Sequence, residues 1–479
     1  MSITRILTMV IVASLVHSNS VCAPGAEPEG PISIGSRLEL LLDDYLIESM
    51  QRKLSFRMHS PQMAERVLHF DAPWELGCDY VTVFKDDDLY RMYYASHLGI
   101  PESYSGENQV TCYAESRDGI QWTKPSLGLV EFQGSKDNNI VLYGGDASHN
   151  FAPFIDTKPG IPASERYKAV GGNNPGPYIF ASADAIHWRL LEEEPLSIEG
   201  KFDSQNVAFW DPHQQQYLFY FRIKPGYRYI ALSTSQDFRN WTSTVPIDVG
   251  NAPRQQLYTN ATIPYFRAPH VYLSFPMRYF KGFPTLLKTD KPIKPKGISD
   301  GVFMFSRDGL HFDRRYLEAF IRPGISPRNW TKHSVMTSWG LLATAEDEIS
   351  VYILQHYHSD TAHLRRGVLR TDGFVSLHAA YSGGEFTTRP LTFSGNRLVL
   401  NVSTSAAGSV RVEIQDADGN PLDGYHLKDS QRIYGDTIRH VVHWQADGDV
   451  SGLAGTPVRL RFVMRDADLY SLRFAEDGP

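Results

Sequence analysis

Carboxylates, histidines and arginines occur in this sequence at positions where a β-fold could gather them for glycosidic-bond hydrolysis. That reaction needs two carboxyl groups across the scissile bond, because one protonates the leaving oxygen while the other activates water or attacks the sugar. The candidate catalytic residues are Glu75, Asp79, Asp203 and Asp300. The candidate substrate-binding residues are Trp74, His97, His149, Asn150, Asn206, Arg222, Asn260, Arg278, Trp339 and His356.

Each carboxylate could also be a capping or loop residue without chemistry. Four acids that converge on one point repel one another unless a ligand, a cation or an arginine offsets them. Arg222 and Arg278 could supply that offset, or they could bind an acidic sugar substituent such as a carboxylate or sulfate. No Cys/His spacing predicts a metal site. We expect no cofactor, and a structural calcium ion in the axial channel is left open.

A short repeat indicates the elements that must position these residues. The pattern is Ser, any residue, Asp, three residues and an aromatic residue. It occurs at 116–122, 182–188, 235–241 and 306–312, with a degenerate copy at 371–374. Asp-Gly is a tight-turn signal, because glycine accepts a positive φ and aspartate bonds to its own backbone. The Asp residues of the repeat are therefore predicted to be structural.

Upstream of each Asp turn lies a tyrosine-centred strand, and another apolar run precedes that strand. The tyrosines are Tyr90, Tyr167, Tyr217, Tyr272 and Tyr352, and their uneven spacing predicts long insertions in the first and fourth units. Each unit predicts a four-stranded antiparallel meander, and five such sheets around an axis form a propeller. The predicted fold class is all-β, a five-bladed β-propeller followed by a C-terminal β-sandwich.

Meander geometry sorts the loops onto two faces. If the first strand of each sheet is innermost, the Asp turns lie at one end. The links between sheets and the loops between second and third strands then lie at the other end. The candidate residues come from these latter segments, which also contain Tyr258-Thr259-Asn260 and Lys332-His333.

The predicted domains are a signal peptide at 1–26, the five-bladed β-propeller at 27–380 and the β-sandwich at 381–479. The sandwich is indicated by alternating runs such as 409–414 and by the turn at 416–420. Residues 36–48 predict one further strand, which could close the ring.

The N-terminus and the composition indicate where the protein works. Arg5 followed by the apolar run 6–16 is typical of a secretory signal and is too short to span a bilayer. We therefore expect a secreted or periplasmic protein without a membrane span. A net charge of -7 predicts no nucleic-acid partner, and we expect a monomer. Cys78 and Cys112 could pair in an oxidising compartment or remain buried thiols.

These patterns resemble a known superfamily. Ser116-Arg-Asp-Gly-Ile-Gln-Trp122 after a tyrosine strand, repeated around five units, is similar to the five-bladed glycoside hydrolases of families 32, 43, 62 and 68. The segments Leu41–Ile47, Ala72–Glu75 and Arg370–Ser376 more closely resemble bacterial secreted proteins with a glycosyl hydrolase family 32 N-terminal-like domain. The resemblance implies that Glu75 or Asp79 is the nucleophile or base and that Asp203 is the carboxylate of the third blade.

The chain departs from this superfamily in two ways. The Asn-Asp-Pro-Asn-Gly segment of invertases is absent, and the second unit offers His149-Asn150 where an acid is expected. A role for Asp300 rests only on the face on which it is placed.

Three functions remain open. The first is a glycoside hydrolase that cleaves a poly- or oligosaccharide with a carboxylate pair in the propeller funnel. The second is a non-catalytic carbohydrate-binding propeller, which would bind sugar without turnover. The third is a protein-interaction scaffold, which would show a large exposed apolar patch and no affinity for sugar.

Overall fold

The computed structural model describes residues 30–476, with gaps at 52, 99–107, 145, 287–295, 358 and 446. Within these ranges the regular structure consists of strands and four short 3-10 helices, with no α-helix. The 3-10 helices are η3 (Asp146–Ser148), η4 (Ala163–Glu165), η5 (Pro327–Asn329) and η6 (Ser451–Leu453). The prediction of an all-β chain is confirmed, whereas the predicted signal peptide at 1–26 lies outside the described residues.

The first three repeat units form three sheets. Sheet I contains β6 (Asp79–Asp86), β7 (Leu89–His97), β8 (Gln109–Ser116), β9 (Trp122–Thr123) and β10 (Ile140–Tyr143). Sheet II contains β11 (Ala152–Ile155), β12 (Tyr167–Gly171), β13 (Tyr178–Ser182) and β14 (Arg189–Leu190). Sheet III contains β15 (Val207–Asp211), β16 (Gln216–Ile223), β17 (Tyr229–Ser235) and β18 (Val245–Pro246). Sheets II and III are four-stranded antiparallel meanders in chain order, as predicted.

The fourth unit carries the predicted insertion. Sheet IV contains β20 (Ile263–Tyr265), β21 (Ala268–Ser274), β24 (Met304–Ser306) and β25 (Phe312–Asp313). Between β21 and β24 the chain forms two strands of a separate side sheet, which contains β19 (Gln256–Leu257), β22 (Met277–Pro284) and β23 (Lys296–Gly301).

The fifth unit is completed by the N-terminal part of the chain. Sheet V contains β26 (Met336–Thr337), β27 (Leu342–Ala343), β28 (Glu348–Gln355), β29 (His363–Arg370) and β5 (Gln62–His69). Strand β5 pairs antiparallel with β29, with His69 opposite His363. A strand that precedes sheet I therefore finishes the last sheet.

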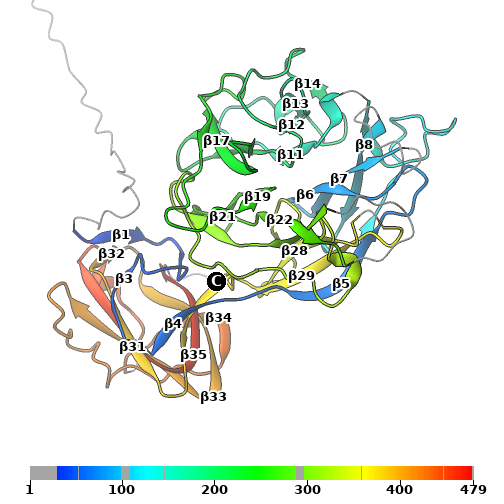
Figure 1. Cartoon of the computed structure of the whole chain (residues 1–479). Helices are drawn as coiled ribbons and strands as arrows, with labels where there is room; N and C mark the ends of the chain where they lie inside the picture. Colours follow the sequence, from blue (N-terminus) through cyan, green and yellow to red (C-terminus); the bar gives the residue numbers. More distant parts are fainter. Residues whose placement is uncertain are drawn as a thin grey trace, which may run out of the picture.

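The remaining strands form one ten-stranded C-terminal sheet (Figure 1). Its N-terminal members are β1 (Ile32–Gly35), β2 (Glu39–Leu40), β3 (Ile47–Met50) and β4 (Leu54–Met58). Its other members are β30 (Val375–Ala379), β31 (Gly384–Thr388), β32 (Leu391–Phe393), β33 (Arg397–Asp416), β34 (Asp436–Val441) and β35 (Val458–Ala475).

The expectation that residues 36–48 close the ring is wrong. Strand β2 pairs with β35 and β3 pairs with β31, so this segment belongs to the C-terminal sheet. Its leucines alternate between two cores. Leu40 and Leu42 pack with buried residues of sheets IV and V, whereas Leu41 packs within the C-terminal sheet. A division of the chain near residue 380 must therefore count residues 32–58 with the C-terminal part.

The first strands of several of these sheets lie next to one another. Strand β11 contacts β6 and β15, and β27 contacts β6. The Trp339 backbone N–H donates to Val81 O at 2.7 Å, and its indole N–H donates to Thr262 O at 2.9 Å. The Gln205 side chain also donates to Val81 O, at 3.1 Å. These bonds connect sheets I, III, IV and V at their inner strands.

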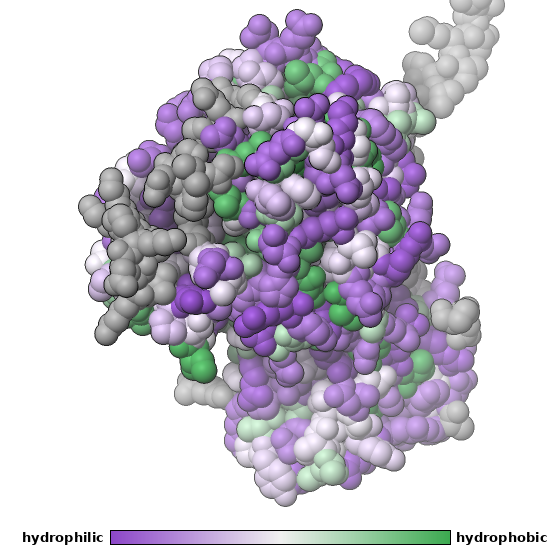
Figure 2. Space-filling model, turned by 90° about the vertical axis from the view of Figure 1, so that its right-hand side faces the viewer, coloured by the Kyte–Doolittle hydropathy of each residue, from purple (hydrophilic) through white to green (hydrophobic). Residues whose placement is uncertain are grey.

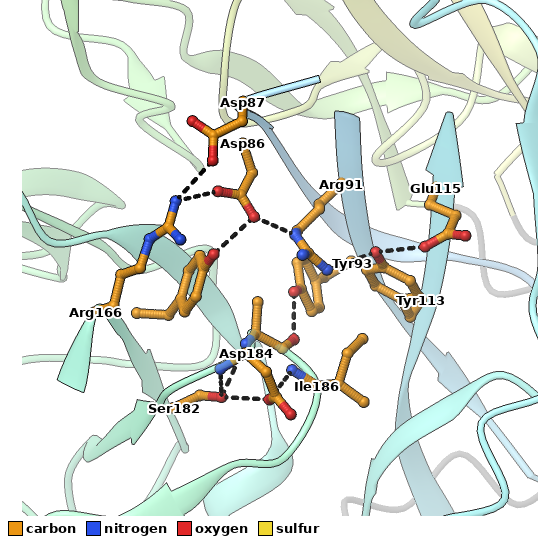
Figure 3. Close-up of polar contacts among 12 residues, drawn as sticks. Asp86, Asp87, Arg91, Tyr93, Tyr113, Glu115, Arg166, Ser182, Asp184 and Ile186 are labelled. Carbon is orange, nitrogen blue, oxygen red and sulfur yellow. Dashed lines mark hydrogen bonds and ion pairs between the residues drawn. The ribbon is translucent and has the colours of Figure 1, made fainter. Parts of the chain in front are cut away.

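The Asp turns are structural, as predicted. In sheet II the Ser182 hydroxyl donates to Asp184 at 3.0 Å, and the same carboxylate oxygen accepts the N–H groups of Ile186 and His187 at 2.9 and 2.8 Å. The next residue, Ala185, has a positive φ of 68°. Its carbonyl accepts the Tyr93 hydroxyl of sheet I at 2.6 Å (Figure 3). The turn therefore shapes its own sheet and bonds to the preceding one.

A second bond set between sheets I and II surrounds the buried Asp86, at the end of β6 (Figure 3). Its carboxylate accepts Arg91 at 2.7 Å, Arg166 at 2.8 Å and the Tyr167 hydroxyl at 2.7 Å. Burial and this carboxylate raise the pKa of Tyr167 to about 12. The repeated tyrosine is thus a donor to the neighbouring sheet, at the end of the sheets opposite to the candidate site.

Two contact regions join the C-terminal sheet to sheet IV. Asp43 forms an ion pair with Arg307, which lies in the Asp turn of sheet IV, at 2.5 Å. The Tyr316 hydroxyl donates to Leu42 O at 2.6 Å. The degenerate fifth repeat supplies Asp372, whose buried carboxylate accepts Tyr265 of sheet IV at 2.6 Å and Ser471 of β35 at 2.8 Å.

Cys78 and Cys112 are buried free thiols. Burial raises the pKa of both thiols well above the usual value. The sequence left open a disulfide or two buried thiols, and the structure has two unpaired thiols.

Candidate functional site

One edge of sheets I to V gathers the polar residues that can do chemistry. This edge carries the start of β6, the links that precede β15, β20 and β26, and the loop between β16 and β17. We call the group that it collects the edge cluster. Its members are Asp79, Tyr80, His97, His149, Asp203, Arg222, Arg228, Tyr258, Lys332, His333 and Tyr357.

Asp79 is the first residue of β6 and lies beside the end of β7. One carboxylate oxygen of Asp79 lies 3.1 Å from Nε2 of His97, and the Asp79 side chain is 14% exposed. Tyr357, which follows β28, donates its hydroxyl to Asp79, and burial together with this carboxylate raises the pKa of Tyr357 well above the usual value. Two sheets therefore hold this carboxylate in place.

Asp203 lies in the link that precedes β15 and is much more exposed, at 58% of its side chain. His149 Nε2 lies 3.6 Å from one oxygen of Asp203, and Arg222 lies 3.4 Å from the other. Burial raises the pKa of Asp203, but the hydrogen bond from His149 and the charge of Arg222 outweigh it, so the pKa lies below the usual value. Asp203 is consequently an ionised carboxylate at neutral pH.

A pair of buried tyrosines is close enough to both carboxylates to feel their charges. The Tyr80 and Tyr258 hydroxyls are 3.4 Å apart, and both side chains are buried. Burial raises the pKa of Tyr80 well above the usual value, and the charges of Tyr258, Asp203 and Asp79 add to the rise. Asp79 and Asp203, which are far apart in the sequence, are thus both near one phenol.

Cations surround Tyr258 on several sides. The guanidinium carbons of Arg222 and Arg228 lie 5.0 and 5.1 Å from the centre of its ring. The His333 ring lies 4.3 Å from the same ring, and Lys332 precedes His333 in the chain. Burial lowers the pKa of Lys332, as do the charges of Arg228 and Arg222, while Asp203 and Asp79 partly offset these effects.

The chemistry available to this arrangement is proton transfer and polar ligand binding. An ionised carboxylate can act as a base or a nucleophile, and a second carboxyl group can deliver a proton. The arginines and Lys332 can bind an anion or hydroxyl oxygens. Of the candidate residues from the sequence, the structure gathers Asp79, Asp203, His97, His149 and Arg222 at this edge.

Glu75 is placed away from the edge cluster. Its side chain is fully buried and accepts Lys124 at 2.6 Å, the Tyr94 hydroxyl at 2.5 Å and the backbone N–H groups of Asp71 and Ala72 at 3.1 and 3.0 Å. These donors occupy both oxygens, so the geometry argues against a catalytic role. The neighbouring Trp74 donates its indole N–H to Asn139 at 2.7 Å and packs against Phe132.

The three predicted asparagines are buried and bond to the backbone. Asn150 and Asn206 both donate to Phe202 O, at 3.1 and 2.8 Å, and Asn260 donates to Gln205 O at 3.2 Å. Trp339 is also buried, with the inter-sheet bonds given above. These four residues hold the links between sheets, and their contacts are with the protein itself.

Asp300 and Arg278 lie together in the side sheet, on β23 and β22. They form a two-bond ion pair at 2.9 and 2.6 Å, and Arg278 also donates to Leu317 O at 2.8 Å. Asp300 lines a cavity of about 420 Å³ together with Phe280, Arg322 and Trp330. Arg278 is therefore occupied by Asp300, and the pair is not part of the edge cluster.

His356 lies in another loop, after β28. Its ring nitrogens lie 3.1 Å from Ser326 Oγ and 2.9 Å from Thr361 Oγ1. Burial lowers the pKa of His356. The next residue, Tyr357, is the one that reaches Asp79.

Sequence reasoning did not single out Tyr80, Arg228 or Tyr357. Tyr80 directly follows Asp79 in the apolar run 80–84, and that run predicts a buried strand residue. Arg228 and Tyr357 stand at the ends of predicted strands, in loops of the face that holds the candidate residues. Their place in these loops is the sequence signal that could have identified them. Tyr258 and Lys332 stand in segments that were assigned to this face.

No group of three His, Cys, Asp or Glu side chains in the described ranges could hold a metal ion. In the links that precede β11 and β15, the side-chain oxygens of Asn150, Gln205 and Asn206 have no hydrogen-bond partner. Calcium prefers carboxylates together with such oxygens, and this set holds no carboxylate. The axial calcium ion therefore stays a prediction.

None of the helices among the described residues is long and apolar enough to cross a membrane.

Comparisons with known proteins give partial similarities. No protein-family model matches the chain. The uncharacterized protein Rv1502 of Mycobacterium tuberculosis is 27% identical over 159 residues, which are 32% of this chain and 49% of that protein. The chain thus spans about half the length of the curated relatives it matches.

Solved structures similar to this chain include glycoside hydrolases. One is described as a glycoside hydrolase, with a TM-score of 0.45, 13% identity and coverage of 65% of this chain and 92% of that chain. Another is a family 43 arabinoxylan arabinofuranohydrolase from Bacillus subtilis, with a TM-score of 0.43, 13% identity and coverage of 85% and 96%. Similarity at this level assigns no activity, so the following proposal rests on the residues of the chain itself.

Proposed function

We propose that this protein is a secreted or periplasmic glycoside hydrolase that acts on a poly- or oligosaccharide at the edge cluster. Sheets I to V are the five blades of a β-propeller in this proposal, the C-terminal sheet is a β-sandwich, and the protein works as a monomer. The observation that supports the proposal is that Asp79, beside His97, and Asp203, beside His149 and Arg222, lie on the same edge and both act on the buried pair formed by Tyr80 and Tyr258. Two carboxyl groups from different sheets at one edge are what cleavage of a glycosidic bond requires.

The two carboxyl groups have different surroundings, which suggests their roles. Asp203, with its lowered pKa, is the ionised group that takes a proton from the attacking water or itself attacks the anomeric carbon. Asp79 is the less exposed group and delivers the proton to the leaving glycosidic oxygen. The bond between the anomeric carbon and that oxygen breaks, and water supplies the new hydroxyl group. The separation of the two carboxyl groups in a sugar complex would decide between retention and inversion.

Substitution of each carboxylate tests the hydrolase proposal. Wild type, Asp79→Asn and Asp203→Asn would be incubated with plant and algal glycans, and released sugars would be measured. We expect each variant to lose at least about a hundredfold in rate, as for removal of a general acid or base. Asp423→Asn, at a fully exposed position in the C-terminal sheet region, is the matched control and keeps the wild-type rate. Full activity in both edge variants would exclude this carboxylate pair.

A second candidate function is carbohydrate binding without turnover. It is favoured by the 3.1 Å contact between Asp79 and His97 and by the arginines packed around Tyr258, since these contacts suit a fixed binding surface. Bound sugar recovered intact after long incubation would support it. The face shown in Figure 2 is largely hydrophilic with scattered hydrophobic residues, which does not favour a large apolar docking surface there.

A further inference from the structure

We propose that the carbohydrate bound at the edge cluster is anionic and that Arg228 and Lys332 bind its carboxylate or sulfate group. This inference rests on the proposed function and names its substrate class. Arg228 and Lys332 are chosen because, unlike most partly buried cations of the described residues, they have no carboxylate partner.

Several buried or partly buried arginines among the described residues are matched with carboxylates, although Arg314 is buried and bonds instead to Pro253 O and the Gln255 side chain. Arg278 pairs with Asp300 at 2.6 Å, Arg307 with Asp43 at 2.5 Å and Arg366 with Glu65 at 2.8 Å. Each of these charges is balanced within the protein. They need no ligand to offset them.

Arg228 and Lys332 make no ion pair with any carboxylate of the described residues. The hydrogen bond of the Arg228 guanidinium is to the neutral Gln256 side chain, at 3.0 Å. The same group lies 5.1 Å from the ring centre of Tyr258 and 5.2 Å from that of Tyr279. Both cations are partly exposed, so each retains a side that a ligand can approach.

The surroundings of these two cations favour an incoming anion. Arg222 stands on the same Tyr258 ring at 5.0 Å, and its carboxylate contact, Asp203, is long at 3.4 Å. Lys332 lies close enough to Arg228 and Arg222 that their charges, after burial, lower its pKa. Mutual repulsion of partly buried cations is relieved when an anion binds among them. A guanidinium group also matches a carboxylate or sulfate with two parallel N–H bonds.

The position of the cations fits the reaction proposed above. Arg228 and Arg222 share the Tyr258 ring, Arg222 contacts Asp203, and Lys332 precedes His333 on the same ring, so an anionic group held by Lys332 and Arg228 would keep its sugar at the edge that carries the carboxylates. The anionic group binds to the cations while the glycosidic bond meets the carboxylates. A neutral sugar would leave Arg228 and Lys332 without a charged partner.

The test compares acidic oligosaccharides with neutral counterparts of the same chain. The probes are uronate oligosaccharides with their carboxyl-reduced forms, and sulfated oligosaccharides with their desulfated forms. Binding to the full-length protein is measured by calorimetry at low and at moderate salt. We expect one acidic series to bind at least about tenfold more tightly than its neutral form, and added salt to weaken this binding. The series that binds identifies the group as a carboxylate or a sulfate.

Variants connect this preference to the two cations. Arg228→Gln and Lys332→Gln should each weaken binding of the acidic ligand by about tenfold to a hundredfold, since each removes a hydrogen bond to a charged group. Binding of the neutral form should change little, and Lys332→Arg should retain most of the affinity. Arg117→Gln, at an exposed position on an Asp turn of the opposite edge, is the control and should bind like wild type.

A measurement on the wild-type protein keeps the test independent of variant folding. The bound acidic oligosaccharide should protect Lys332 from acetylation, as read by mass spectrometry. Equal binding of acidic and neutral forms, no binding of any acidic form, or unprotected Lys332 would overturn the inference. Salt-sensitive binding of an acidic oligosaccharide without cleavage would instead overturn the hydrolase proposal and leave this inference standing. Cleavage of neutral glycans alone would overturn this inference and leave the hydrolase proposal standing.

Discussion

Glu75 and Asp203 show how the donors around a carboxylate decide what it can do. Glu75 accepts four donors with a fully buried side chain, whereas the Asp203 side chain is 58% exposed, accepts Arg222 at 3.4 Å and lies 3.6 Å from His149 Nε2. The first carboxylate stabilises a turn, and the second is accessible from solvent. The spacing of the sequence places both residues near the same edge. The bonds by which Glu75 holds the fold-back of residues 71–75 could not be inferred from spacing.

Replacement of Glu75 tests its structural role. Glu75→Gln leaves Lys124, which is 20% exposed, without its buried partner, and we expect the free energy of unfolding to fall by about 3–5 kcal/mol. Asp71→Asn is the matched control, because Asp71 contacts the same Lys124 at 3.1 Å but is 79% exposed. It should cost about 0–1 kcal/mol. Denaturant unfolding measures both variants, and an equal effect of the two would contradict the structural assignment.

At the scale of the element, the Asp turn does more than reverse the chain. Tyr93 donates to Ala185 O of sheet II, and Tyr220 donates to Gly309 O of sheet IV, each at 2.6 Å. The turn residue with positive φ therefore presents a carbonyl to a neighbouring sheet. The turns and tyrosine strands could be predicted because both are local patterns that recur. The bonds between sheets could not, because their partners are distant in the chain.

Acid should weaken the Asp turns. Burial raises the pKa of Asp184, but the hydrogen bonds from His187 and Ile186 lower it by more than burial raises it. The pKa of Asp184 in the folded protein therefore lies below that in the unfolded chain. Such a group stabilises the fold above its unfolded pKa, about 4, and this contribution is lost as the pH falls towards the folded pKa. We therefore expect Asp184→Asn to lose stability at pH 7 and to show a smaller further loss on acidification to pH 3 than wild type. Denaturant midpoints at the two pH values would measure this, with the exposed Asp423→Asn as control. An equal loss of stability on acidification in wild type and in Asp184→Asn would contradict this prediction.

The residue that follows the turn aspartate should respond in opposite directions in two sheets. A Cβ atom added at Gly309, where φ is +79°, would lie 2.8 Å from the Tyr220 hydroxyl, so Gly309→Ala should destabilise by about 1–2 kcal/mol or more. Ala185 holds the same position with a φ of 68°. Ala185→Gly should be neutral or stabilise by less than about 1 kcal/mol, since it removes strain but adds unfolded-state freedom. Thermal unfolding of both variants checks the contrast, and destabilisation of equal size would refute it.

For the whole molecule, the N-terminal strands explain why only part of the architecture could be predicted from local sequence patterns. Strands β1 to β4 join the C-terminal sheet and β5 completes sheet V, so the two ends of the chain are interleaved. Leu40, Leu41 and Leu42 are all apolar, and their alternation between two cores is visible only when both cores are known. Strand β5 lacks the tyrosine pattern that marks the other units, and its pairing with β29 spans most of the chain.

This interleaving predicts that the two parts of the chain fold together. A shortened chain that ends at Ala380 loses β31, β32 and β35, which pair with β3, β1 and β2. Leu41, Leu46 and Ile47 would then be exposed, while Leu40 and Leu42 of the same segment must still pack against sheets IV and V. We expect this shortened chain to aggregate, and the full chain to unfold in one calorimetric transition. Co-expression of residues 381–479 as a separate polypeptide should restore a folded complex, because it supplies the missing strand partners. A monomeric, cooperatively folded chain ending at Ala380, or two separate transitions in the full chain, would show that the ring does not depend on the C-terminal sheet.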